Sequence, residues 1–154
     1  MATPTLPELL LALGDQLGIP DLALDEQNTC SMSVDELYSV DIQWQPEASR
    51  LHLVTVVSTL PPPEQQTLTY RLLMEANLFG MATGGAYFAA SEALGEVLLI
   101  RTLEAAHLDL VQLMQALDDF VPAVKFWTQR LAHGVSAMDL APTGTSAATI
   151  IIHP

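Results

Sequence analysis

Residues 80–85 of this 154-residue chain read GMATGG and reproduce the two glycines of a phosphate-binding loop. Such a loop also needs a Lys and then a Ser or Thr directly after the second glycine, because these side chains hold the phosphates and Mg²⁺. Here those two positions are Ala86 and Tyr87. The run also follows an expected helix rather than a strand. We interpret it as the glycine-rich end of that helix and not as a nucleotide site.

Carboxylates and histidines are the next side chains that could catalyse a reaction or hold a metal. The carboxylates include three adjacent pairs, at residues 25–26, 35–36 and 118–119. Neighbouring side chains on a strand point to opposite faces, so such a pair cannot act as acid and base on one substrate. The histidines, at positions 52, 107, 133 and 153, share no i, i+4 spacing and have no cysteine partner. The sequence therefore predicts solvated charges, no metal site and no cofactor.

Cys30 is the only cysteine, so no disulfide can form within the chain. It alternates with Met32 in an apolar set, which favours a small core residue over a nucleophile. No Ser, His, Asp arrangement is recognisable from spacing. We expect a protein that is not an enzyme and that is compatible with a reducing compartment.

The charge balance excludes two classes of partner. Lys and Arg number 5 against 18 Asp and Glu, a formal net charge of −13, and residues 1–49 hold nine carboxylates and no Lys or Arg. Nucleic acids and anionic membranes recruit proteins through clustered positive charge, so neither is expected. No positively charged leader and no run of about 18 apolar residues is present, which predicts a cytosolic protein. The acidic first third either steers a basic partner or keeps an apolar surface soluble.

The elements follow from hydrophobic periodicity. A leucine repeat predicts a helix over residues 6–17 with a stop at Gly18, and the proline run at residues 61–63 opens a second helix. A third helix runs over residues 108–131, and Pro122 should kink or split it. Period-two alternation and β-branched residues predict strands at residues 22–24, 30–34, 38–44, 51–57, 87–88 and 96–103.

These strands imply an antiparallel arrangement. The first two are expected to form a hairpin around a turn at residues 25–28, and the last is so apolar that both of its faces should be covered. The fold class is α+β, an antiparallel sheet with three helices in the order α-β-β-β-α-β-β-α. We expect one domain over residues 1–133 and a flexible C-terminal tail over residues 134–154.

The apolar content exceeds what a thin two-layer domain of this size can hide. Half of the residues are hydrophobic, and Leu11 lies off the buried stripe of the first helix. Two interpretations remain open. One is a plain core, and the other is a binding surface for an extended peptide or another subunit.

Two segments resemble the class I type III secretion chaperones, and in particular the Tir chaperone (CesT-like) family. Residues 8–36 (ELLLALGDQLGIPDLALDEQNTCSMSVDE) combine a leucine helix, a Gly-Ile-Pro stop and two short strands that end on acidic turns. Residues 73–103 (LMEANLFGMATGGAYFAASEALGEVLLIRTL) combine the end of a helix, a Gly-Gly turn, a short strand and an apolar strand. With the length and acidic balance, the resemblance extends over about residues 6–132.

The resemblance implies a bacterial cytoplasmic homodimer that binds the N-terminal region of one or more secreted effectors. It would keep that region extended and secretion-competent and target it to the export apparatus, whose ATPase is a further expected partner. The expected strand-addition edge is at residues 22–25. Carried over by position, the effector-binding residues are Leu11, Leu22, Leu24, Met32 and Val34. The dimer-interface residues carried over in the same way are Leu72, Leu78, Phe79, Tyr87 and Phe88.

An alternative function on the same fold is a regulatory protein that sequesters a cytosolic regulator instead of escorting cargo. A bound partner that is never exported would favour it. We further expect that replacing Leu11 or Met32 by Asp weakens cargo binding and leaves the dimer folded.

Overall fold

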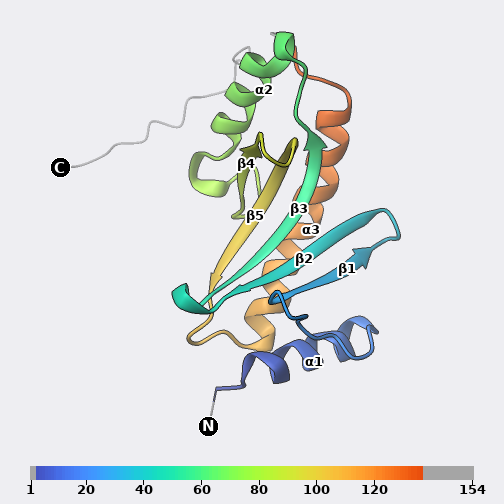
Figure 1. Cartoon of the computed structure of the whole chain (residues 1–154), viewed down its shortest axis with the longest axis vertical. Coiled ribbons are helices and arrows are strands. Elements are labelled where there is room, and N and C mark those ends of the chain that lie inside the picture. The colour runs from blue at the N-terminus through green and yellow to red at the C-terminus, as the bar shows by residue number, and fades with distance from the viewer. Residues whose placement is uncertain (1–2, 137–154) are drawn as a thin grey trace, which may run out of the picture.

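The computed structural model describes residues 3–136 and has the order of helices and strands expected for an α+β chain (Figure 1). The elements are α1 (Leu6–Leu17), β1 (Thr29–Val34), β2 (Tyr38–Gln45), β3 (Arg50–Thr59), α2 (Pro63–Ala76), β4 (Tyr87–Ser91), β5 (Glu96–Glu104) and α3 (Leu110–Ala132). Short 3₁₀ turns follow β2 at Pro46–Ala48 and α2 at Leu78–Gly80. The predicted α-β-β-β-α-β-β-α plan is confirmed.

The strands form one antiparallel sheet in the order β1-β2-β3-β5-β4, so β1 and β4 are its edges. The last predicted strand, β5, has a neighbour on each side. Its Val97 and Leu99 are buried, but Leu98 and Ile100 on the other face are only partly buried. The strand is therefore interior to the sheet, but within the subunit α3 covers one of its faces only, and the other faces the viewer in Figure 1.

The core lies between the sheet and α3. Ile42, Leu53 and Leu99 from the sheet are fully buried, as are Leu113 and Phe120 from α3. The helix α1 lies at the end of the sheet where α3 begins, and it contacts α3 (Figure 1). One face of the sheet and the inner stripes of two helices thus share a single hydrophobic core.

The helix α1 forms where the leucine repeat predicts it. Its first turn is capped reciprocally, since the Glu8 carboxylate accepts a hydrogen bond from the Thr5 amide at 2.8 Å. Leu10 and Leu13 are buried. Gly18 ends the helix with φ 69°, a left-handed conformation that glycine adopts without a steric penalty.

Residues 22–25 are not a strand, so the predicted hairpin around residues 25–28 and the predicted edge at residues 22–25 are wrong. The alternation of apolar and polar residues that predicted this strand has another cause, since Leu22 packs into the core beside Gly14 of α1. Asp25 instead closes a loop: its carboxylate accepts from the Gln27 and Thr29 amides at 2.8 and 3.0 Å. The hairpin at this end of the sheet is β1–β2.

Pro122 neither splits α3 nor ends it, since the helix continues from Leu110 to Ala132. The missing proline N–H leaves the carbonyl of residue 118 without its helical partner. Both Asp118 and Pro122 are exposed, so water can satisfy that carbonyl. The helix is therefore not split at Pro122, because the proline lies on the solvated side of the helix.

The helix α2 begins at Pro63, as the proline run predicts, but it ends at Ala76, before the glycine run that was expected to stop it. The Arg101 guanidinium of β5 donates to the Gly84 carbonyl and lies 3.9 Å from the Asp119 carboxylate of α3. A Cβ on Gly85 would collide with that guanidinium. These glycines therefore permit close packing of the loop onto β5 and α3.

The sequence predicts that the domain ends at residue 133. Val135 is still buried against the core, so the packed region extends past residue 133. The rest of the predicted flexible tail, residues 137–154, lies outside the described residues.

Candidate functional site

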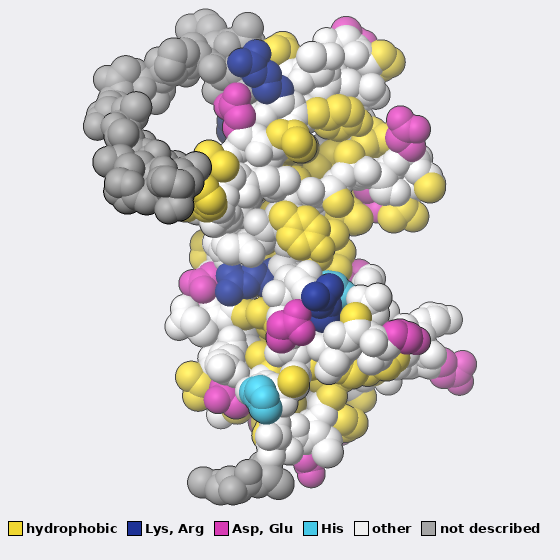
Figure 2. All heavy atoms as spheres, turned by 90° about the vertical axis from the view of Figure 1, so that its left-hand side faces the viewer, with side chains coloured by type: hydrophobic (Ala, Val, Ile, Leu, Met, Phe, Trp, Pro, Cys, Tyr) yellow, Lys and Arg dark blue, Asp and Glu magenta, His cyan; other side chains and the backbone are white. Residues whose placement is uncertain are grey.

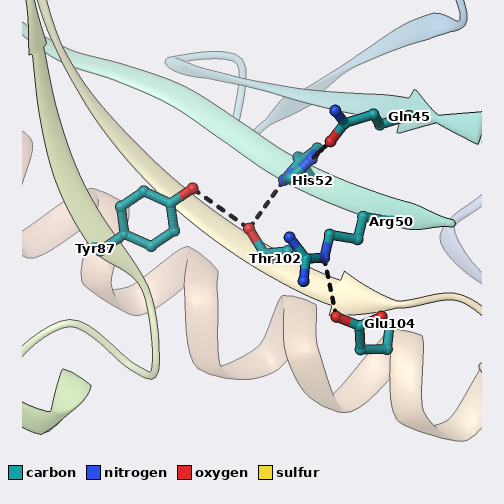
Figure 3. A network of polar contacts seen from close by, with 6 residues as sticks. All are labelled: Gln45, Arg50, His52, Tyr87, Thr102 and Glu104. Atoms are coloured by element: carbon teal, nitrogen blue, oxygen red, sulfur yellow. Dashed lines mark hydrogen bonds and ion pairs between the residues drawn. The ribbon is translucent and has the colours of Figure 1, made fainter. Parts of the chain in front are cut away.

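His52 of β3 takes part in a polar network on the open face of the sheet (Figure 3). Its ring nitrogens lie 2.9 Å from Thr102 Oγ1 and 3.1 Å from Gln45 Oε1, and the Tyr87 hydroxyl also reaches Thr102. Burial, and secondarily the Arg50 charge, lower the pKa of His52. No carboxylate contacts this ring in the network, so the arrangement links four strands rather than forming a catalytic dyad.

Cys30 is buried in β1. Burial, followed by the charges of Asp25 and Asp41, raises the pKa of the thiol to about 11. A nucleophilic cysteine needs the opposite, a pKa lowered by a nearby positive charge. Among the described residues, no group of three His, Cys, Asp or Glu side chains could hold a metal ion.

We expect slow alkylation of Cys30 that still rises with pH above 9. With a pKa of about 11 the thiolate fraction grows about tenfold between pH 9 and 10, whereas that of an ordinary thiol levels off. Iodoacetamide labelling followed by mass spectrometry measures the rate, with a Cys-containing peptide as the reference. Fast labelling that levels off near pH 9 would show an exposed, reactive thiol.

A groove opens between the C-terminal half of α1, the edge strand β1 and the middle of α3. Its volume is about 400 Å³. We call it the α1–β1–α3 groove, and its lining residues are Leu17, Ile19, Met32, Ser33, Val34, Asp35, Met114, Leu117, Asp118, Val121 and Pro122. Eight of these eleven residues are apolar, and they come from α1 and the loop after it, from β1 and from α3. The groove therefore offers a mainly apolar floor beside a free strand edge.

The free edge can be assigned from the hydrogen-bond alternation of β1. The Trp44 amide donates to the Asn28 carbonyl at 2.8 Å, and Met32 is paired with Val40 in the same register. In an antiparallel ladder alternate residues direct their backbone groups to the neighbouring strand, so those of Ser31 and Ser33 point away from β2. The loop residue Asp25 satisfies the outward groups of Thr29. Ser31 and Ser33 thus form the open part of the edge.

The predicted effector-binding residues lie in three places: two line this groove, two pack against the core, and one is exposed on α1 outside the groove lining. Met32 and Val34 line the groove, although Met32 is only 5% exposed. Leu11 is 49% exposed on α1, outside the groove lining. Leu22 is buried and Leu24 partly buried, and neither lines the groove. The burial of Met32 changes one expectation, because an Asp at this position would place a carboxylate in the core and destabilise the subunit.

Sequence reasoning missed the wall that α3 supplies. Met114, Val121 and Pro122 face the groove together with Asp118. Their spacing of i, i+4, i+7 and i+8 is a helical stripe, and this was the available signal. Periodicity alone could not tell that this stripe faces a sheet edge rather than the core.

A second apolar surface surrounds the end of α2 and the start of β4, and we call it the α2–β4 surface. Figure 2 views the molecule from the left-hand side of Figure 1 and shows hydrophobic side chains gathered on the upper part of that side. Leu78 is 61% exposed and Phe79 is 70% exposed. The surface consists of Met74, Leu78, Phe79, Met81 and Tyr87.

The other two predicted dimer residues are less accessible. Leu72 is partly buried against the core. Phe88 is buried, and its ring lies edge-on to Trp127 with the centroids 5.0 Å apart. In the subunit Phe88 therefore packs on α3 instead of presenting its ring to a partner.

The charges at the groove are uneven. The Lys125 ammonium of α3 pairs with the Asp35 carboxylate at the end of β1. The side chain of Asp118, on the same helix, has no hydrogen bond or ion pair with any residue that the structure describes.

No helix within residues 3–136 is long and apolar enough to cross a membrane.

Comparison with known proteins gives one family. The model of the Tir chaperone protein (CesT) family matches residues 8–128, which is most of the chain. No curated protein matches the sequence.

Solved structures share the fold. A chain of the ExsC–ExsE complex has a TM-score of 0.69 and 26% identity, with 82% of this chain and 93% of that chain covered. A chain of the HopA1–SchA chaperone–effector complex has a TM-score of 0.65 and 18% identity, covering 79% and 91%. A chain of the Yersinia pestis complex between the type III secretion chaperone SycH and a fragment of YscM2 has a TM-score of 0.61 and 20% identity, covering 80% and 99%.

Proposed function

The chain belongs to the Tir chaperone protein (CesT) family, and on this premise we propose that it is a type III secretion chaperone for effector proteins. It binds the N-terminal region of one or more effectors and keeps that region extended. The observation that carries this proposal is the open edge of β1 beside the α1–β1–α3 groove. A chain of the HopA1–SchA chaperone–effector complex has the same fold, which supports the proposal.

Binding begins with strand addition to β1. The backbone groups of Ser31 and Ser33 are free to pair with an extended segment, which becomes a sixth strand. Alternate side chains of that segment then point toward α3 and enter the groove beside Met32 and Val34. Main-chain hydrogen bonds supply affinity for any extended segment, while the groove selects apolar side chains at every second position.

The groove alone is too small to hold a complete effector region. Ordering a disordered segment costs about 2–5 kcal/mol, so the apolar contact must continue beyond a cavity of about 400 Å³. Leu11, exposed on α1, offers such an extension. The effector therefore follows β1 and continues across α1.

The α2–β4 surface is the proposed homodimer interface. Its members Leu78 and Phe79 are mostly exposed in the single subunit, and exposed apolar patches of this kind mark association sites. The two proposed surfaces lie on different elements, so a dimer formed in this way leaves both β1 edges free.

The protein acts without catalysis of its own, since the family is one of chaperones and not of enzymes. We place it in the bacterial cytoplasm, where effectors are held before export. Delivery of the loaded chaperone to the ATPase of the secretion apparatus completes the proposed role.

Replacing Leu11 by Asp is expected to weaken effector binding about tenfold and to leave the subunit folded. The side chain is half exposed, so the change removes part of the roughly 1.5–3 kcal/mol of a buried leucine from the complex only. Isothermal titration with the effector fragment measures the affinity, and thermal unfolding measures stability. The matched control is Leu94→Asp, an exposed leucine in the β4–β5 turn, and equal effects of both changes would remove Leu11 from the site.

The direct test of the function is to identify what co-purifies with the tagged protein from its native bacterium. Mass spectrometry should find a protein that the bacterium exports by type III secretion, bound through its N-terminal region. Deleting the chaperone gene should then abolish secretion of that protein. A bound partner that is never exported would indicate sequestration of a regulator instead.

A further inference from the structure

The two walls of the α1–β1–α3 groove each carry a carboxylate at its lip. Asp35 stands at the end of β1, and Asp118 stands on α3. Lys125 neutralises Asp35, whereas Asp118 has no partner among the described residues. The groove is therefore apolar along its floor and acidic at its rim, with one carboxylate left unpaired.

No Lys or Arg side chain of the subunit is left unpaired to neutralise this rim. It contains five Lys and Arg residues, and all of them have partners within the subunit. Arg50 pairs with Glu104, Arg71 with Glu75, Arg101 with Asp119, Lys125 with Asp35, and Arg130 donates to the Gly134 carbonyl. The region that forms α1 and β1 belongs to the first 49 residues, which hold nine carboxylates and no Lys or Arg. A cation that pairs with Asp118 would therefore have to come from outside the subunit.

A purely apolar segment is a poor match for such a rim. When it covers the groove, it removes water from Asp118 and offers no hydrogen-bond donor in return, which is unfavourable. A Lys or Arg side chain can lay its methylene groups on Val121 and Pro122 and place its charged end at Asp118.

We propose that the α1–β1–α3 groove selects extended segments with apolar residues at every second position, and that one Lys or Arg within this same set of groove-facing positions places its charge at Asp118. This inference rests on the proposed strand addition to β1 and names the chemistry of the segment that adds. The apolar side chains fill the groove, and the basic side chain supplies specificity. The acidic character of the first third of the chain increases the rate of encounter with the same segments.

Three fluorescein-labelled 12-residue peptides test the preference. They carry Thr at every second position and Leu or Val at the positions between, except that one central position of the Leu and Val set holds Lys, Gln or Glu. Fluorescence anisotropy should rank the affinities in the order Lys, Gln, Glu, and the affinity for the Lys peptide should fall about tenfold between 50 mM and 500 mM NaCl. Equal affinities for all three peptides would overturn the charge preference and leave strand addition standing. Binding of none of them would overturn both.

Substitutions locate the effect. Asp118→Asn should weaken the Lys peptide about two- to fivefold and leave the Gln peptide unchanged. The matched control is Glu47→Gln, which removes one carboxylate from the exposed turn after β2 and should change neither affinity. Lys125→Met frees the Asp35 carboxylate and should strengthen the Lys peptide about two- to fivefold. Equal losses of affinity for the Lys peptide in Asp118→Asn and Glu47→Gln would show that only the net charge of the protein matters and that Asp118 does not contact the basic side chain.

Discussion

Replacing Ser33 by proline is expected to weaken effector binding by more than about 100-fold while the sheet stays folded. The Ser33 amide points away from β2, so its loss removes no hydrogen bond from the subunit, and proline is tolerated at such edge positions. In the complex the same change removes one main-chain hydrogen bond and places the pyrrolidine ring in the path of the added strand. A combined loss of about 3 kcal/mol corresponds to the stated change in affinity.

The matched control is Ser33→Ala, which keeps the amide and should bind within about twofold of the original protein. Isothermal titration with the effector fragment gives both affinities, and circular dichroism with thermal unfolding confirms the fold. If Ser33→Pro is folded and binds as tightly as Ser33→Ala, the segment does not add to β1.

The second large effect is expected at the α2–β4 surface. Changing both Leu78 and Phe79 to Asn should raise the dissociation constant of the dimer by about 100-fold or more. Two apolar side chains per subunit lose their contact, and each contributes up to about 1.5–3 kcal/mol when fully buried. Phe79 has a φ of 56°, a region that Asn tolerates better than Phe, so the change adds no backbone strain.

Light scattering combined with size-exclusion chromatography, at several concentrations, measures the change in mass. The matched control is Val111→Asn, which replaces an equally exposed apolar side chain at the start of α3 and should leave the dimer intact. A double variant that remains dimeric at low micromolar concentration would place the interface elsewhere.

The sequence predicts the elements well because most of them repeat apolar residues at the period of their own structure. The leucines of α1 and the β-branched run of β3 are examples. Leu22 fails this logic, since it is buried by contact with α1 and not by strand pairing. The spacing of apolar residues indicates which side chains are buried, but it does not indicate which neighbouring element buries them.

The candidate site is harder to predict because it depends on packing between elements that are distant in the chain. The strand order places β5 between β3 and β4, and this leaves β1 as a free edge. Only that order brings Val34 of β1 opposite Val121 of α3 across a groove. Phe88 is a second example: the resemblance implies an interface residue, and within the subunit its ring also packs edge-on against Trp127, a contact between distant parts of the chain.

Hydrogen–deuterium exchange on the amides of Ser31 and Ser33 tests the central claim most directly. The two amides point away from β2 and should exchange quickly in the free protein. Adding the N-terminal fragment of the effector identified by co-purification should slow their exchange by at least about tenfold, because they then donate to the added strand. Unchanged exchange at both amides in a saturated complex would contradict strand addition to β1 and, with it, the function assigned to the groove.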